Sequence, residues 1–154
     1  MSDDLLVAEH VTKFFPITRG ILIKHEVGSV KAVDDVSFTV KRGETLGIVG
    51  ESGCGKSTLA RCLMRLLEPT GGKILFDGRE ITTLSRKEMR PLRREMMMVF
   101  QDPYASLNGR KRVGFIVGEP LEVHGIGTNQ ERKRSVQELL EIVGLNPEHY
   151  NRFP

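Results

Sequence analysis

The chain has 154 residues, of which 39% are hydrophobic and 28% are charged. These values are typical of a folded globular domain and exclude a disordered or fibrous chain. The net charge of +3 comes from 23 basic and 20 acidic residues that are interspersed, so charge alone predicts no nucleic-acid-binding surface. The acidic start is unlike a secretory signal, and no apolar run approaches the roughly 18 residues of a membrane-spanning helix.

The first predicted elements are strands. Residues 5–11 are typical of a short strand, and residues 15–28, which contain proline and two glycines, of a loop or a long hairpin. Residues 36–40 alternate apolar and polar side chains. Residues 45–49 are apolar throughout, which predicts a strand buried on both faces.

A helix is predicted to begin at Lys56, because leucines and a cysteine then recur at helical spacing until Pro69 and a glycine pair end the pattern. Residues 73–77 are a further strand candidate. The cysteines, Cys54 and Cys62, match no metal-binding spacing, which is typical of a reduced cytosolic chain.

Two capping boxes predict helix starts. Ser85 with Glu88 predicts a short helix ahead of Pro91, and Thr128 with Glu131 predicts a second helix. The apolar face expected on that second helix consists of Val136, Leu139, Leu140 and Val143.

The remaining segments give weaker signals. Residues 96–100 form another apolar run, and residues 112–123 have mixed helical character that we expect Pro120 to break. Residues 149–154 carry no signal for a regular element.

The motif with the clearest chemistry is GESGCGKST at residues 50–58, which satisfies the phosphate-binding pattern G-x-x-x-x-G-K-[ST]. Glycines let backbone amides wrap a triphosphate, and a helix that starts directly afterwards presents its positive end to the phosphates. Lys56 would reach the β- and γ-phosphates, the Ser57 hydroxyl would ligate magnesium, and Thr58 would contact the α-phosphate. The residues predicted to bind nucleotide are Gly50, Glu51, Ser52, Gly53, Cys54, Gly55, Lys56, Ser57 and Thr58. The alternative is a glycine-rich turn without ligand.

The chain resembles ATP-binding-cassette (ABC) transporter ATPases over nearly its whole length. The resemblance rests on the run KAVDDVSFTVKRGETLGIVGESGCGKSTLARCLMRLLEPTGGKILFDG and on MMMVFQDPYASLNGR. It implies an α/β fold of the P-loop NTPase class, with an N-terminal antiparallel β subdomain and the start of a helical subdomain. We therefore expect one incomplete domain over residues 1–154, divided into an ATP-binding core, 1–110, and the start of the helical subdomain, 111–154.

The resemblance also implies roles for two residues outside the P-loop. Phe15 would stack on adenine, with Phe14 as its neighbour, although both phenylalanines could instead be core residues. Gln101 would ligate magnesium, sense the γ-phosphate and act with Lys56 in catalysis; its alternative is a polar residue at a strand end. Gly109 departs from the proline that the subfamily has there, which affects a loop conformation.

The resemblance further implies what the chain does and where. ESGCGKST, QDPYASLN and the inserted stretch after Phe15 are similar to ATPase subunits of bacterial dipeptide and oligopeptide importers, and nickel importers share this pattern. The implied cofactors are ATP and Mg²⁺. The implied partners are membrane permease subunits, a second ATPase subunit and, indirectly, a solute-binding protein, at the cytoplasmic face of the inner membrane.

The chain ends at NRFP, before the signature motif, the acidic strand with its catalytic glutamate and the switch histidine of that family. None of the histidines, His10, His25, His124 and His149, occupies the switch position. We therefore expect this piece to bind ATP without turnover, and its parent protein to be an ATPase.

Two alternatives remain open. One is a nucleic-acid-handling ATPase of the same fold, whose footprint would be Arg86, Lys87, Arg90, Arg93 and Arg94. A charge cluster on a short helix is more often a solvated face, so we expect no nucleic-acid partner. The other is a non-hydrolysing nucleotide sensor or a truncated product.

Overall fold

The computed structural model describes residues 3–19, 25–100, 102 and 106–154 of the chain. It divides into two compact units, Met1–Met97 and Met98–Pro154. Each unit is described by itself below. The finer division of the chain at residue 110 stays a prediction.

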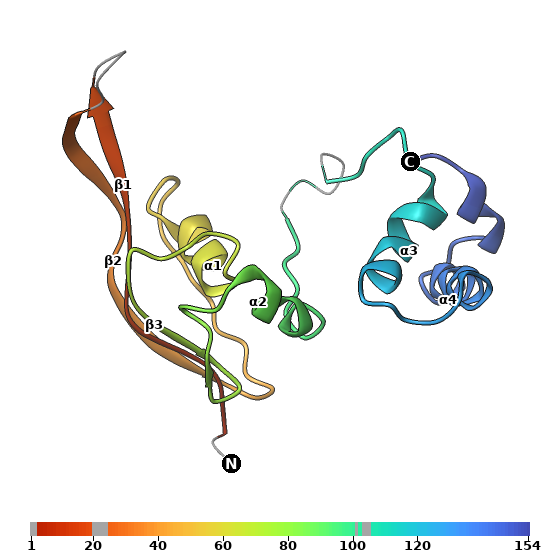
Figure 1. Cartoon of the computed structure of the whole chain (residues 1–154), viewed down its shortest axis with the longest axis horizontal. Coiled ribbons are helices and arrows are strands. Elements are labelled where there is room, and N and C mark those ends of the chain that lie inside the picture. The colour runs from red at the N-terminus through yellow and green to blue at the C-terminus, as the bar shows by residue number, and fades with distance from the viewer. Residues whose placement is uncertain (1–2, 20–24, 101, 103–105) are drawn as a thin grey trace. The chain divides into compact units, whose positions relative to one another are not determined.

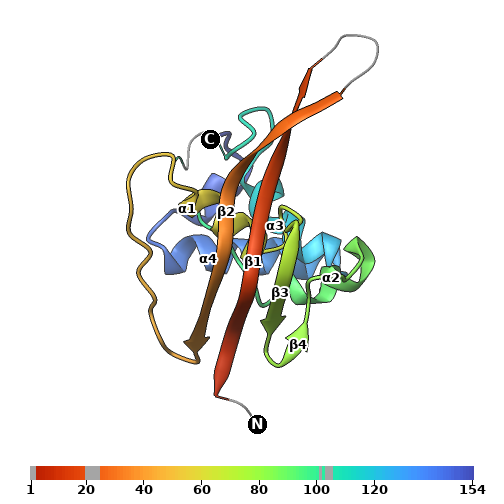
Figure 2. The ribbon, with the colours of Figure 1, turned by 90° about the vertical axis from the view of Figure 1, so that its left-hand side faces the viewer.

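The first unit contains an antiparallel sheet of four strands in the order β2-β1-β3-β4 (Figure 1, Figure 2). The strands are β1, Asp4–Arg19, β2, His25–Lys41, β3, Gly71–Phe76, and the short β4, Arg79–Glu80. Strand β1 lies between β2 and β3, and its Ala8 and Val11 are buried. The expected N-terminal antiparallel β subdomain is confirmed.

Strands β1 and β2 continue past the end of β3 as a two-stranded hairpin (Figure 2). The pairing of β1 with β3 ends at Thr12 and Gly71, whereas its pairing with β2 runs on to Arg19 and His25. The first strand is therefore much longer than residues 5–11. For residues 15–28 the sequence predicted either a loop or a long hairpin, and the described residues of this segment are paired as a hairpin. Residues 20–24 lie outside the described residues.

Two helices of the first unit pack on one side of the sheet, α1, Lys56–Leu63, and α2, Arg86–Leu92 (Figure 1). Helix α1 begins where the sequence predicted. Helix α2 has the predicted capping box but continues through Pro91, so the expected end ahead of this proline is wrong. The reason is that the helix ends one residue later, and the missing amide costs a single hydrogen bond at its last turn. The core between the sheet and the helices consists of Ala8, Val11, Val33, Leu59, Cys62, Leu63, Ile74, Phe76, Ile81, Met89 and Met96.

The strand predicted at residues 45–49 is not formed. Residues 45–49 and the apolar run 96–100 have no regular structure, and none of the described strands pairs with them. Val49, Met97 and Val99 expose 95%, 87% and 86% of their surface, so the predicted burial of residues 45–49 is wrong. A strand is held by hydrogen bonds to a neighbouring strand, and the described part of the chain offers these segments none.

The second unit is helical and contains α3, Val113–Val123, α4, Asn129–Ile142, and the 3-10 helix η1, Pro147–Asn151. Helix α3 runs through Pro120, so the expected break there is wrong; the helix ends three residues later. No sequence signal predicted η1. Its Tyr150 ring occupies the space that a side chain at Gly114 would need, which shows how closely η1 packs on α3.

Helix α4 begins with the predicted capping box of Thr128 and Glu131. On its predicted apolar face, Val136 and Leu140 are buried, whereas Leu139 and Val143 are 46% and 68% exposed. The buried part of the face is narrower than predicted because α3 and η1 are the elements packed against α4 in this unit. Among the described residues, no helix is both long and apolar enough to cross a membrane.

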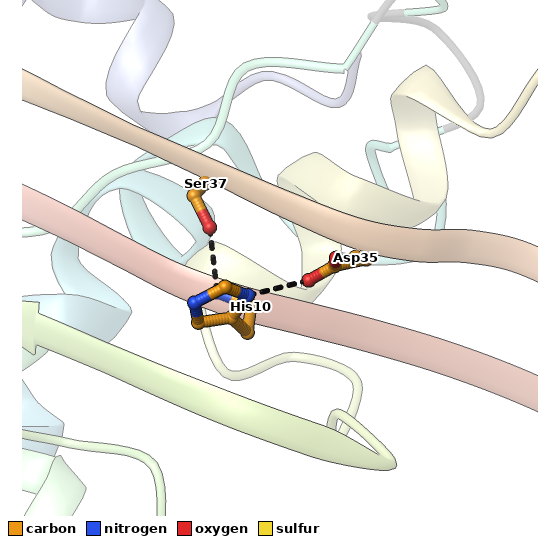
Figure 3. Close-up of polar contacts among 3 residues, drawn as sticks. All are labelled: His10, Asp35 and Ser37. Atoms are coloured by element: carbon orange, nitrogen blue, oxygen red, sulfur yellow. Dashed lines mark hydrogen bonds and ion pairs between the residues drawn. The ribbon is translucent and has the colours of Figure 1, made fainter.

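A pair of facing irregularities interrupts the β1–β2 ladder. His10 and Asp35 both adopt positive φ, 52° and 55°, where the register shifts between Ala8 and Val11. The Nδ1 atom of His10 lies 2.6 Å from the Asp35 carboxylate, and the His10 amide donates a hydrogen bond to the Ser37 hydroxyl (Figure 3). These contacts satisfy polar groups that the interrupted ladder leaves without strand partners.

Candidate nucleotide-binding site

The P-loop connects the irregular segment 45–49 to the start of α1. Gly53 and Gly55 have φ values of 84° and 99°, in the left-handed region that favours glycine. A Cβ atom at Gly55 would collide with the backbone carbonyl of Ala32 in β2. The loop therefore needs glycine at position 55 for two reasons, and through this contact it rests on the sheet.

The N-terminus of α1 is open. Its N-cap is Gly55, which provides no side-chain acceptor, and the first turn contains no acidic residue. The amides of this turn point out of the helix without intrahelical partners, at the positive end of the helix dipole. Such an end favours an anion, and phosphate groups are the ligands that helix N-termini of this kind accept.

Lys56 folds back into the loop. Its Nζ atom donates hydrogen bonds of 2.6 Å to the carbonyl oxygens of Gly50 and Glu51, and it lies 3.5 Å from the Cys54 sulfur. Main-chain carbonyl oxygens thus hold the Lys56 ammonium group within the loop. This places a positive charge next to the open N-terminus of α1, where the two together attract an anion more strongly than either alone.

The other predicted residues of the motif lie on the same short stretch. Glu51, Ser52, Gly53 and Cys54 are exposed, Ser57 is exposed on the first turn of α1, and Thr58 is half-buried. Leu59, Cys62 and Leu63 anchor the helix in the core behind them. Burial raises the pKa of the Cys62 thiol, although Lys13 and Arg65 act in the opposite direction. Cys62 is therefore a neutral core residue, unlike the exposed Cys54.

Phe15 lies on the hairpin of β1 and β2, with 39% of its surface exposed. The ammonium group of Lys13 is 5.1 Å from the centre of the Phe15 ring, which puts these two side chains on one face of the strand. Phe14 points to the other face, toward Lys31. The Phe14 amide donates a hydrogen bond to the Thr70 hydroxyl, which also donates to the Phe14 carbonyl. Phe15 is the more exposed of the two rings, as a stacking surface requires.

Gln101 lies outside the described residues, so its predicted role stays a prediction. The described residues contain no cluster of three or more histidine, cysteine, aspartate or glutamate side chains that could hold a metal ion. Sequence reasoning missed Ala32, which supports the loop through its carbonyl group. No signal in the sequence could have found it, because the contact is made by the backbone.

The comparisons with known proteins identify the family of this chain. The family model described as "ABC transporter" matches residues 33–153, which is most of the chain and includes the P-loop. This chain belongs to the ABC transporter family. Membership implies nucleotide binding.

Similar curated proteins come from peptide transport systems. The oligopeptide transport ATP-binding protein AppF of Bacillus subtilis is 52% identical over 99% of this chain and 46% of its own length. The di/tripeptide transport ATP-binding protein DppF of Pseudomonas aeruginosa is 44% identical, again over 99% of this chain and 46% of its own length. This ABC chain spans about half the length of these relatives.

The fold is also found among solved structures. The dimeric structure of MJ0796, described as a bacterial ABC transporter cassette, has a TM-score of 0.77 and 25% identity over 97% of this chain and 61% of that one. A post-hydrolysis structure of the same cassette bound to ADP and phosphate has a TM-score of 0.75 and 26% identity over the same shares. The expected ABC-type fold is thus confirmed.

Proposed function

We propose that this chain is the nucleotide-binding part of a subunit that powers the import of peptides across a bacterial membrane. The proposal for ATP rests on the P-loop, and the proposal for peptides rests on the names of relatives such as AppF and DppF. Hydrolysis of ATP is proposed for the whole protein. Nickel importers share the sequence pattern and remain the second candidate for the transported solute.

The observation that carries the proposal is the pairing of Lys56 with the open end of α1. The loop carbonyls that hold its ammonium group are those of Gly50 and Glu51, and a triphosphate is a stronger partner for the same group. We infer that Lys56 leaves these carbonyls for the β- and γ-phosphates when ATP binds. The amides of the loop and of the first turn of α1 would bond the remaining phosphate oxygens.

The donor set fits magnesium bound together with nucleotide. The Ser57 hydroxyl is exposed at the N-terminus of α1, and Mg²⁺ in such sites takes most of its ligands from phosphates and water. We propose that Ser57 and Gln101 hold the ion, which would supply charge neutralisation for phosphoryl transfer. Thr58 would contact the α-phosphate, and the exposed ring of Phe15 would stack on adenine after Lys13 moves aside.

The proposed partners follow from the same relatives. An ATP-binding subunit of an importer works on permease subunits in the membrane and pairs with a second ATPase subunit, so we propose a peripheral location on the cytoplasmic face of the inner membrane. A solute-binding protein would act indirectly, through the permease. We propose no nucleic-acid partner. The negative charge of Glu88, which caps α2, lies among the basic residues of this helix and interrupts their positive charge.

The experiment is a titration of this chain with Mg²⁺-ATP by calorimetry, in which Lys56→Ala is compared with the parent. Removing a hydrogen-bonded charge costs about 1.5–3 kcal/mol, so the variant should bind roughly 10- to 150-fold more weakly. Lys73→Ala is the matched control, because Lys73 is an exposed lysine on β3 away from the loop.

The control variant should bind ATP as the parent does. Equal affinity of the Lys56→Ala variant and the parent would contradict the proposed site. Weakening of both variants by the same factor would show that the lysines act only through net charge.

A further inference from the structure

A second concave site lies in the first unit, at the opposite end of α1 from the P-loop. It is a cleft of about 690 Å³ between the turn after α1, the hairpin strand β1 and helix α2. This volume is within the range of small-molecule sites. Buried Met89 forms part of the wall, and charged side chains provide much of the rest.

The charge of the cleft is unbalanced. Lys13, Arg65, Arg86 and Arg93 line it, whereas among the described residues Glu68 is its single acidic lining residue. Among the ion pairs of the described residues, none involves any of these four cations. A concave surface with one sign of charge concentrates ions of the other sign.

Arg65 and Arg93 are held side by side. Arg93 donates hydrogen bonds from its two terminal nitrogens to the carbonyl oxygens of Met64 and Arg65, the latter at 2.8 Å. Arg65 in turn bonds the carbonyl oxygens of Ile81 and Leu84, at 3.0 and 3.2 Å. Burial lowers the pKa of Arg93, and the nearby charge of Arg65 lowers it further.

These backbone bonds fix both guanidinium groups without neutralising them. Each guanidinium has five N–H donors, and the bonds to carbonyls use two of them in each residue. The remaining donors are already oriented, because the bonds that are formed restrain the planar groups. A rigid guanidinium matches the paired oxygens of a phosphate or carboxylate group.

We propose that this cleft binds a compact multivalent oxyanion, with Arg65 and Arg93 as the fixed donors and Lys13 and Arg86 as mobile cations at its edge. The ligand carries two or more phosphate or carboxylate groups. The site has no lining residue in the P-loop, although Lys13 also lies 5.1 Å from the centre of the Phe15 ring and so links it to the adenine-stacking position proposed above. A recessed cleft with fixed donors favours a compact anion over an extended acidic polypeptide.

The test uses inorganic pyrophosphate as the probe and the whole chain carrying Lys56→Ala, so that binding at the P-loop is weakened. Calorimetry at low salt should show binding. Adding Arg86→Glu should weaken it about three- to tenfold, because the change turns an attraction into a repulsion. Arg86 is exposed at the first position of α2, where a carboxylate suits the helix dipole and the fold should be kept.

The matched control is Lys87→Glu. Lys87 is the next residue of the same helix, is exposed, and does not line the cleft. It should change pyrophosphate affinity by less than about twofold, since an exposed charge outside the site acts only weakly. The same titrations are repeated with a hexaglutamate peptide.

Each outcome decides the proposal. Binding of pyrophosphate that Arg86→Glu weakens more than Lys87→Glu supports it. Absence of pyrophosphate binding overturns it, and so does equal weakening by the two substitutions, which would indicate a diffuse surface effect. Binding of the peptide alone, with the same dependence on Arg86, overturns it in favour of an acidic polypeptide partner.

Discussion

Strand β3 and residues 45–49 are two short apolar segments of the first unit with opposite fates. In β3, Ile74 is fully buried and its neighbours pair with β1. In residues 45–49, Ile48 is 43% exposed and Val49 is 95% exposed, with no strand partner in the described part of the chain. The two segments have similar strand-forming residues. The difference teaches that partners, rather than propensity, decide whether such a segment becomes a strand.

The P-loop is intermediate between the paired strand β3 and the unpaired residues 45–49. It follows residues 45–49 directly in the chain, but its supporting contact comes from β2, through the carbonyl group of Ala32. The sheet therefore supports the P-loop, whereas residues 45–49 are mostly exposed and pack little against it.

The largest expected effect is on the free energy of unfolding, which a substitution in β3 should lower more than one in residues 45–49. Ile74→Ala should lower the free energy of unfolding by about 2–5 kcal/mol, because it removes fully buried methyl groups and leaves a cavity. Ile48→Ala should lower it by less than about 1 kcal/mol, since much of that side chain is already in water. Urea unfolding of both variants measures the difference. Similar losses would show that residues 45–49 are packed in solution.

A smaller effect should separate the sheet from the loop. Gly55→Ala should lower the free energy of unfolding by about 1–3 kcal/mol and weaken ATP binding, because it combines a φ of 99° with a clash against Ala32. Gly53→Ala is the control. It has a φ of 84° but no atom within 4 Å of the new Cβ, so it should cost less. Similar losses for the two variants would show that the contact with the sheet does not support the loop.

The smallest effect concerns the helix ends, which are fixed by neighbours in sequence and not by distant strands. Hydrogen bonds from Ser85 lower the pKa of Glu88, and those from Thr128 lower the pKa of Glu131. A carboxyl group with a lowered pKa stabilises the fold above its unfolded pKa, and this contribution is lost as the pH falls through the folded value. Stability should therefore decrease on acidification below the ordinary glutamate pKa of about 4.3.

Ser85→Ala and Thr128→Ala test this point. Each should cost about 0.5–2 kcal/mol at neutral pH, and the cost should shrink in acid because the carboxylate that completes the capping box is then protonated. Thermal unfolding at pH 7 and pH 3 measures both values. A cost that does not change with pH would mean that the hydroxyl group acts without its glutamate.

The same contrast explains what the sequence could predict. The start of α1 and the capping boxes depend on residues within a few positions of one another, and they were predicted correctly. Whether residues 45–49 form a strand depends on a pairing partner elsewhere in the chain, and a run of apolar residues does not show whether such a partner is present. The His10 and Asp35 irregularity and the Ala32 contact with Gly55 are also long-range, because each joins segments more than 20 residues apart.

Lys56 has a consequence for the thermodynamics of the loop. Its ammonium group donates to the carbonyls of Gly50 and Glu51, so the loop without ligand is already organised around a charge. When an external anion takes this charge, the two hydrogen bonds of the ammonium group are exchanged for others, and the amides of the first turn of α1 gain partners. Because the loop is already organised, little of the binding free energy is lost in ordering it.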